Sequence, residues 1–227
     1  MADLEVLQKV LYDKSYTCPL CGESFKSKAI RSGKNQLISV DLDLYAHYSL
    51  VNPLFYSVIA CPHCGYSVLT KTLAPLLPKQ KEWLSEHFSK TLSHTPYSEY
   101  ATIDEVIKKY KMALLACMTR KSHISEQGYI ALSLAWLYRD LEDTANEQLF
   151  LKRAFSAFCE AFSKERFPII GMDELTFAYS IAAIAYEIGE LEESKKYLSM
   201  VLTAIGCPPK IKDRALELKQ IIFSGTP

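Results

Sequence analysis

Two matching cysteine pairs are the residues in this sequence best suited to chemistry. The first is CPLCG at Cys18–Gly22 and the second is CPHCG at Cys61–Gly65. A CxxC step turns the chain so that both sulfurs converge on one ion, and a glycine after each pair suits a backbone φ above zero. A tetrahedral cation needs four soft ligands about 2.3 Å away. The sequence therefore predicts one structural Zn²⁺ bound by Cys18, Cys21, Cys61 and Cys64.

Three other chemistries use the same kinds of residue. Disulfide exchange needs one CxxC at the start of a helix, but here there are two pairs and Gly65 follows the second. Rubredoxin-like iron uses the same motifs, and the ligand set alone leaves it open. Catalytic zinc needs an open coordination position, which four cysteines fill. His63 is expected to face solvent, and His47 is a further candidate ligand that four cysteines make unnecessary.

The composition is that of a folded domain without a charge bias. Of 227 residues, 49% are hydrophobic and 23% charged, with 26 basic and 26 acidic side chains. These values exclude a disordered chain and a globally basic nucleic-acid binder. The sequence has no run of about 18 uncharged apolar residues, so it predicts no membrane-spanning helix. Asp3 and Glu5 lie where a signal peptide would have basic residues. We expect a cytoplasmic protein whose other cysteines are packing residues: Cys117, Cys159 and Cys207.

Residues 1–77 read as a small zinc-ribbon-like module rich in β-structure. Leu37–Leu42 alternates apolar and polar residues, and Phe55–Ala60 runs as a strand into the second cysteine pair. Tyr66–Leu69 is placed to pair back as a hairpin, and residues 3–12 predict a short helix. Such a module is too small for a core of its own, so its folding free energy should come largely from metal binding.

Residues 78–227 predict an α-helical domain. Lys79–Leu92 is the first expected helix, ended by His94–Pro96, and Thr102 with Glu105 forms a capping box for the next. Gly189 and Gly206 are placed to end helices. The remaining expected helices are Ser125–Leu141, Thr144–Lys164, Met172–Ile188, Leu191–Ile205 and Lys210–Phe223.

A weak internal repeat suggests how these helices are arranged. A shift of 47 residues places Leu134–Ala135 on Ile181–Ala182 and Glu142 on Gly189. The segment from Ala182 to Leu202 resembles a tetratricopeptide (TPR) hairpin, although the period exceeds about 34 residues and only two units are visible. We predict a mainly α fold with a TPR-like antiparallel helical-hairpin array; an irregular helical bundle is the alternative.

Four segments of the sequence follow one another in the order of a known family: Tyr16–Cys21, Asp41–Leu44, Asn52–Tyr66 and Leu134–Arg139. In this order they resemble the bacterial family of unknown function DUF2225. The resemblance is specific in the first 70 residues and weaker in the helices. It implies a cytoplasmic protein with an N-terminal zinc-binding part and TPR-like helices, and it supplies no activity, substrate or catalytic residue.

Binding functions fit this sequence better than catalysis. Stacked helical hairpins offer a concave surface for an as yet unidentified protein partner, so we expect a non-enzymatic adaptor or scaffold. The alternative is nucleic-acid contact through a basic loop that contains Lys26, Lys28, Arg31 and Lys34 and no acid.

Catalysis has little support in the residues. The sequence has no phosphate-binding glycine motif, no HExxH and no GxSxG, and its histidines are scattered. Asp41 and Asp43 would share a face of a strand, but their alternation with Leu42 and Leu44 suits an ordinary half-buried strand. We therefore predict no catalytic residues.

Overall fold

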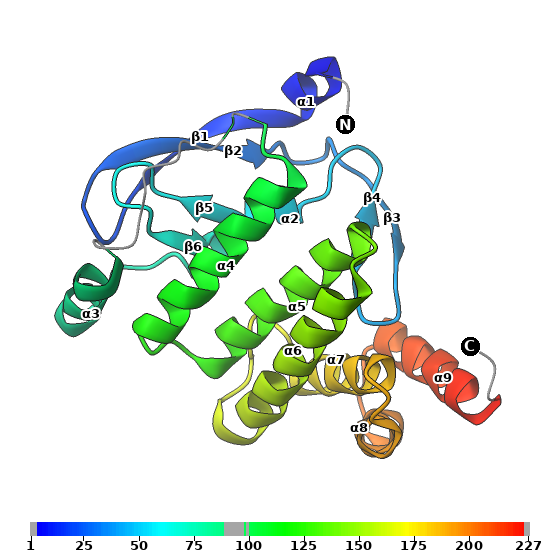
Figure 1. Ribbon diagram of the computed structural model, residues 1–227. Coiled ribbons are helices and arrows are strands. Elements are labelled where there is room, and N and C mark those ends of the chain that lie inside the picture. Colours follow the sequence, from blue (N-terminus) through cyan, green and yellow to red (C-terminus); the bar gives the residue numbers. More distant parts are fainter. Residues whose placement is uncertain (1–3, 89–97, 99, 225–227) are drawn as a thin grey trace. The chain divides into compact units, whose positions relative to one another are not determined.

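The computed structural model describes residues 4–88, 98 and 100–224. The chain forms two compact units, Met1–Ser39 with Ala46–Ser122, and Val40–Tyr45 with His123–Pro227 (Figure 1). Most of the described residues are helical, and the strands are short and lie near the N-terminus. A mainly α fold with a small N-terminal β part is thereby confirmed. The helices between residue 77 and Ser122 belong to unit 1, whereas the sequence predicted a domain boundary between residues 77 and 78.

The part of unit 1 that the structure describes contains three two-stranded sheets. Strands β1 (Leu11–Thr17) and β2 (Ser24–Ile30) are antiparallel, with Leu11 opposite Ile30 and Thr17 opposite Ser24. The short strands β5 (Val58–Ala60) and β6 (Ser67–Leu69) form a second hairpin, as the sequence predicted for Tyr66–Leu69. Strand β3 (Leu37–Val40) pairs with β4 (Ala46–Tyr48). Both cysteine pairs lie in the turns of the first two hairpins.

Three predicted elements of unit 1 were wrong in part. The N-terminal helix α1 spans Leu4–Val10, because the chain turns into strand β1 at Leu11. The predicted strand at Phe55–Ala60 begins instead as the one-turn helix α2 (Leu54–Ser57). The Asn52 side chain accepts a hydrogen bond from the Leu54 amide at 3.0 Å and so initiates the turn. The predicted basic loop at 26–34 is largely strand β2, because the first cysteine turn returns the chain along β1.

Helices complete unit 1. After the 3-10 turn η1 (Thr70–Thr72) come α3 (Pro78–Phe88) and α4 (Ile103–Thr119), and α4 crosses the β5–β6 hairpin (Figure 1). The predicted capping box is confirmed, since Thr102 accepts from the Glu105 amide and Glu105 accepts from the Thr102 amide. The predicted continuation of α3 to Leu92 and its end at His94–Pro96 lie outside the described residues.

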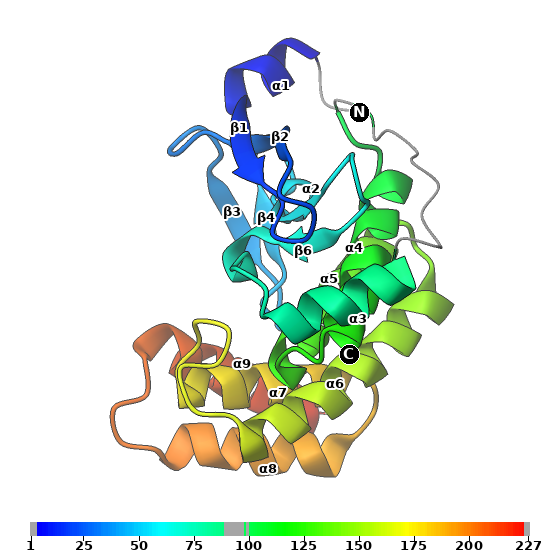
Figure 2. The ribbon, with the colours of Figure 1, turned by 90° about the vertical axis from the view of Figure 1, so that its left-hand side faces the viewer.

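The described residues of unit 2 include two helical hairpins, a further helix and the loop 40–45. Helices α5 (Ile124–Asp140) and α6 (Thr144–Lys164) pack together, and so do α7 (Glu174–Glu187) and α8 (Leu191–Thr203) (Figure 2). The last helix, α9 (Pro209–Ser224), packs on α7 and α8. In the described part of the chain, none of the helices has both the length and the apolarity to span a membrane.

The turns of the two hairpins match at the 47-residue shift predicted from the sequence. Glu142 and Gly189 both have a left-handed backbone, with φ of 57° and 81°. The Asp143 amide donates to the Tyr138 carbonyl at 3.0 Å, and in the second turn the Glu190 amide donates to the Ala185 carbonyl at 2.8 Å. The repeat is therefore present in the backbone of both turns. The likeness to TPR hairpins stays a prediction.

Candidate metal centre

The two cysteine turns have the same local structure. In the first, the Cys18 amide donates to the Glu23 carbonyl at 2.9 Å and the Gly22 amide donates to the Cys18 carbonyl at 2.9 Å. In the second, the Cys61 amide donates to the Tyr66 carbonyl at 2.9 Å and the Gly65 amide donates to the Cys61 carbonyl at 2.8 Å.

The glycine of each turn makes this conformation accessible. Gly22 and Gly65 have φ of 82° and 70°, the left-handed region predicted from the sequence. Each turn therefore projects two sulfurs to one side of the backbone.

The two turns bring four sulfurs close together, those of Cys18, Cys21, Cys61 and Cys64. All lie within 4.8 Å of one another. The Cys18 and Cys64 sulfurs are 3.6 Å apart, and those of Cys21 and Cys61 are 3.7 Å apart. Sulfurs arranged as a tetrahedron about 2.3 Å from a central ion would be separated by about 3.8 Å, whereas a disulfide bond is about 2.05 Å long. All four cysteines are free, and their spacing fits a tetrahedral metal ion.

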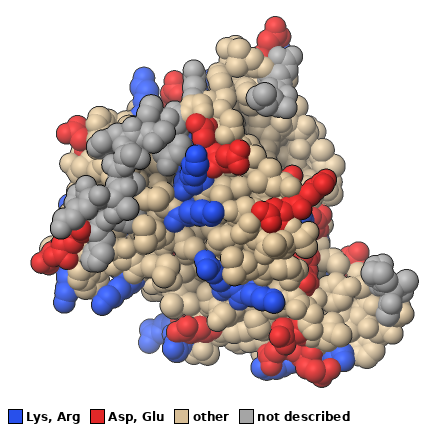
Figure 3. Space-filling model, viewed as in Figure 1, with Lys and Arg blue, Asp and Glu red and all other residues tan. Residues whose placement is uncertain are grey.

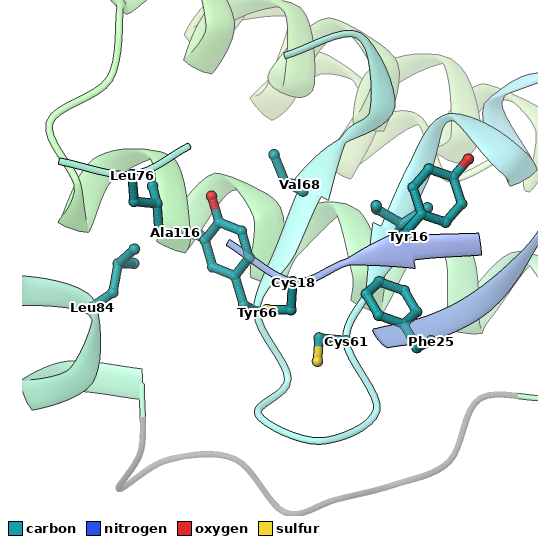
Figure 4. Close-up of a cluster of buried hydrophobic side chains, with 10 residues drawn as sticks. Tyr16, Cys18, Phe25, Cys61, Tyr66, Val68, Leu76, Leu84 and Ala116 are labelled. Carbon is teal, nitrogen blue, oxygen red and sulfur yellow. The ribbon is translucent and has the colours of Figure 1, made fainter. Parts of the chain in front are cut away.

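The cluster is buried on one side and open on the other. Cys18 and Cys61 are each 2% exposed and belong to a hydrophobic cluster with Tyr16, Phe25 and Tyr66. Figure 4 shows Cys18 and Cys61 between the rings of Tyr66 and Phe25. Cys64 is half-buried, but Cys21 is exposed. The apolar contacts therefore bury two of the four cysteines and leave Cys21 exposed.

The thiols influence one another's ionisation in the absence of a cation. A hydrogen bond from Cys64 stabilises the Cys18 thiolate and lowers the pKa of Cys18 to about 5. The same hydrogen bond raises the pKa of Cys64. Burial raises the pKa of Cys61 to about 11. The raised pKa values of Cys61 and Cys64 oppose deprotonation of these two thiols, and a divalent cation is the charge that would offset this cost.

The sequence also matches a known protein family over most of its length. Residues 11–222 match the family described as "Uncharacterized protein conserved in bacteria (DUF2225)". The chain belongs to DUF2225. No curated protein and no solved structure matches it.

Within the described residues of this DUF2225 chain, the four cysteines are the one group with metal-ligand geometry. His63 is exposed at the tip of the second turn, as expected, and His47 lies on β4 outside the group. Four soft sulfur donors at this spacing fit Zn²⁺, and they fit iron equally well as a ligand set.

The predicted basic residues of the DUF2225 chain lie along β2 and directly after it. Lys26 and Lys28 lie two apart on β2 and line one pocket, to which α4 contributes Lys109. Lys28 lies 3.0 Å from the Asp13 carboxylate, and the Arg31 guanidinium lies 5.5 Å from the ring centroid of Tyr12. Lys34 follows β2 and is exposed. On the face drawn in Figure 3, basic and acidic side chains are interspersed.

Sequence reasoning missed a second charged cluster, which lies in unit 2. Asp43 was expected on a half-buried strand, but β3 ends at Val40 and Asp43 is fully buried. Its carboxylate accepts hydrogen bonds from the Trp136 indole at 2.7 Å and from Arg139 at 2.9 Å. Three further acids surround the same guanidinium: Glu147 at 2.6 Å, Glu187 at 2.6 Å and Asp41 at 3.6 Å. We call these five residues, Arg139 and its four acids, the Arg139 cluster.

One guanidinium faces four carboxylates in the Arg139 cluster, so the charges are unequal. Burial disfavours the charged guanidinium, but Asp43 and Glu187 outweigh that effect and raise the pKa of Arg139. Burial and the charge of Asp43 raise the pKa of Glu187 to about 7. A signal was present in the sequence: Arg139 directly follows the mostly apolar run Ile130–Tyr138, which the structure buries throughout.

Proposed function

We propose that this protein is a non-enzymatic interaction protein whose first unit is built around one structural Zn²⁺. The observation that carries the proposal is the sulfur arrangement, in which four cysteine ligands lie at tetrahedral spacing. Four protein ligands complete the coordination shell of zinc, so no position is left for a substrate or an activated water. Cys18, Cys21, Cys61 and Cys64 would each donate one thiolate, and the ion would link the β1–β2 and β5–β6 hairpins.

Unit 2 supports an interaction role because its helices already hold a short segment of chain. Arg214 donates to the Val40 carbonyl at 3.1 Å and to the Asp41 carbonyl at 2.9 Å. The Tyr179 hydroxyl donates to the Leu42 carbonyl at 2.8 Å. Hydrogen bonds to the main chain are one of the means by which proteins bind extended peptides.

An exposed apolar face of α9 supports a surface for the partner. Leu216 and Phe223 are 50% and 70% exposed. They are seven residues apart, so they lie on the same side of the helix. Phe223 is the one aromatic residue among the exposed large hydrophobic side chains of the described residues. Aromatic anchors dominate interface energetics, so we propose that the partner contacts this face.

The zinc proposal is tested by metal analysis of the purified protein. Elemental mass spectrometry should find one zinc per chain, and the protein should be colourless because an iron–thiolate site is coloured. The variant Cys61→Ser should lose the metal, whereas Cys207→Ser, which changes a half-buried cysteine outside the cluster, should retain it. Stoichiometric iron would overturn the zinc assignment.

The interaction proposal is tested by affinity capture with matched variants of α9. Phe223→Ala and Leu216→Ala should each abolish recovery of a defined partner while leaving the thermal unfolding midpoint unchanged. Leu218→Ala on the same helix is the control: Leu218 is fully buried, so stability should fall by about 2–5 kcal/mol. If either surface variant lowers the unfolding midpoint, that residue is a packing residue and its assignment fails.

The nucleic-acid alternative is resolved in the same capture. Material lost on nuclease treatment or at moderate salt would move the proposal to Lys26, Lys28, Arg31 and Lys34. A protein partner that survives both treatments contradicts that alternative. The cytoplasmic location and the TPR-like character of the helices remain part of the proposal.

A further inference from the structure

We propose that Cys21 is a reactive thiolate, modified first by peroxides and other soft electrophiles, and that Cys61 completes a disulfide with it. The inference rests on the proposed structural metal site and adds a modification chemistry to it. It is carried by two observations within the cluster. The four cysteines differ in how far each residue is exposed, and the sulfur of the exposed Cys21 lies 3.7 Å from that of the buried Cys61.

The difference in accessibility separates Cys21 from the other ligands. Cys18 and Cys61 are each 2% exposed and packed in the hydrophobic cluster, and Cys64 is half-buried. Cys21, in contrast, is exposed. Reaction of a cysteine with an electrophile requires both thiolate character and access. Metal ligation would supply thiolate character to all four sulfurs, so access decides which reacts first.

The contact with Cys61 determines the second step of the reaction. In the first step, the Cys21 thiolate attacks one peroxide oxygen, the O–O bond breaks, and the products are a sulfenic acid on Cys21 and hydroxide. The Cys61 thiolate, whose sulfur lies 3.7 Å away, then attacks the Cys21 sulfur and expels a second hydroxide. Two thiolates are oxidised by two electrons in total and one peroxide is reduced. Only Cys18 and Cys64 remain as ligands, so metal release accompanies the disulfide.

The remaining cysteines of the chain make useful internal references. Cys117 is buried, and Cys159 and Cys207 are half-buried. Burial raises the pKa of both Cys159 and Cys207, so these thiols are less ionised than an ordinary cysteine. A residue-by-residue comparison therefore separates a property of Cys21 from a general sensitivity of the chain to oxidants.

The test uses the purified, zinc-loaded full chain. It is labelled with a limiting amount of N-ethylmaleimide, and the extent of modification at each cysteine is read by peptide mass spectrometry. Cys21 should be modified at least about tenfold faster than Cys18, Cys61, Cys64 or Cys117, as expected when access controls the rate. Titration with hydrogen peroxide should release one zinc per peroxide consumed, and unreduced peptides should show a Cys21–Cys61 disulfide.

Two variants make the outcome decisive. Cys21→His replaces the accessible thiolate but keeps a zinc ligand, because three cysteines and one histidine also form structural sites. It should retain zinc and lose it to peroxide markedly more slowly than the parent chain. Cys207→Ser should release zinc at the parental rate.

The possible results distinguish a failure of the Cys21 inference from a failure of the structural zinc proposal. A zinc-loaded chain in which a buried ligand or Cys207 reacts first overturns the present inference and leaves the structural zinc proposal intact. A Cys18–Cys21 disulfide overturns the assignment of Cys61. A chain purified without any metal overturns both.

Discussion

In each unit of the protein, four acidic or ionisable side chains surround a single site that suits a cation. In unit 1 these are four cysteines, which meet with sulfurs 3.6 and 3.7 Å apart in two pairs. In unit 2 they are four carboxylates, and the positive charge is the Arg139 guanidinium. The cation of unit 2 is part of the chain, whereas that of unit 1 must come from solution. We therefore expect the two units to differ in what controls their stability.

The surrounding structure amplifies this difference. Among its described residues, unit 1 has short two-stranded sheets and hydrophobic clusters, one of which includes Cys18 and Cys61. Unit 2 has helices such as α5 and α7, whose central residues are buried on nearly every side. Short β-hairpins that are joined through a metal site rely on the bound metal for much of their folding free energy, but packed helices do not.

The largest expected effect comes from removing the metal. A strong chelator, or Cys61→Ser, should abolish hydrogen-exchange protection of the amides in β1, β2, β5 and β6. Protection in α5 and α7 should persist. Loss of a structural zinc removes on the order of 10 kcal/mol of apparent stability from the region that binds it. Equal loss of protection in both units would show that their stabilities are not separately controlled.

The next effect concerns Arg139. Arg139→Met keeps much of the length of the side chain but leaves four acids without their counter-charge, among them Asp43, which is fully buried. Breaking one partner of a buried ion pair costs about 3–5 kcal/mol. Urea unfolding should show this loss in unit 2 while the zinc content stays unchanged. Arg166→Met, at a position outside the Arg139 cluster, is the control and should lie within about 0.5 kcal/mol of the parent.

A double variant sharpens the interpretation of that loss. Adding Asp43→Asn to Arg139→Met removes the buried charge while keeping an acceptor for the Trp136 indole. Part of the lost stability should return. If the two substitutions are instead additive, the cost of Arg139→Met does not come from an uncompensated Asp43.

The third effect is a pH dependence of stability that arises in the Arg139 cluster. The folded chain raises the pKa of Glu187 to about 7, from 4.5 in the unfolded chain. The folded state therefore binds more protons between these values, so the free energy of unfolding should fall as pH rises from about 4.5 to about 7. The size should be on the order of 1–3 kcal/mol, because each unit of pKa shift corresponds to about 1.4 kcal/mol.

Glu187→Gln separates this contribution from the other titrating groups. The amide resembles the protonated acid, so the variant should be at least as stable as the parent near pH 7 and should lack most of the slope. Glu174→Gln, an exposed acid in the first turn of the same helix, should keep the slope. An unchanged slope in Glu187→Gln would assign the pH dependence to another group.

The contrast between the clusters also explains what the sequence could predict. The cysteine ligands lie in two local motifs, so their spacing alone predicted the group, the glycine conformations and the hairpin that follows Gly65. The Arg139 cluster draws its members from a loop, α5, α6 and α7, and no local spacing brings these together. Asp41 and Asp43 were visible, but alternation with leucines predicted a strand. Asn52 similarly redirected Phe55–Ala60, because a side-chain hydrogen bond outweighed β-propensity.

The smallest expected effect tests the internal repeat energetically. Glu142 and Gly189 occupy equivalent turns, and both have a left-handed backbone. A non-glycine residue pays about 1–2 kcal/mol for this conformation, and glycine loses about 0.5–1 kcal/mol through the greater freedom of its unfolded state. Glu142 is exposed, so Glu142→Gly should stabilise unit 2 by up to about 1 kcal/mol. Gly189→Ala should destabilise it by a similar amount, although the added Cβ meets nothing within 4 Å. Opposite signs in urea unfolding would show that the two turns obey one backbone rule. A destabilising Glu142→Gly would mean that the Glu142 side chain makes a contact which its counterpart in the second hairpin lacks.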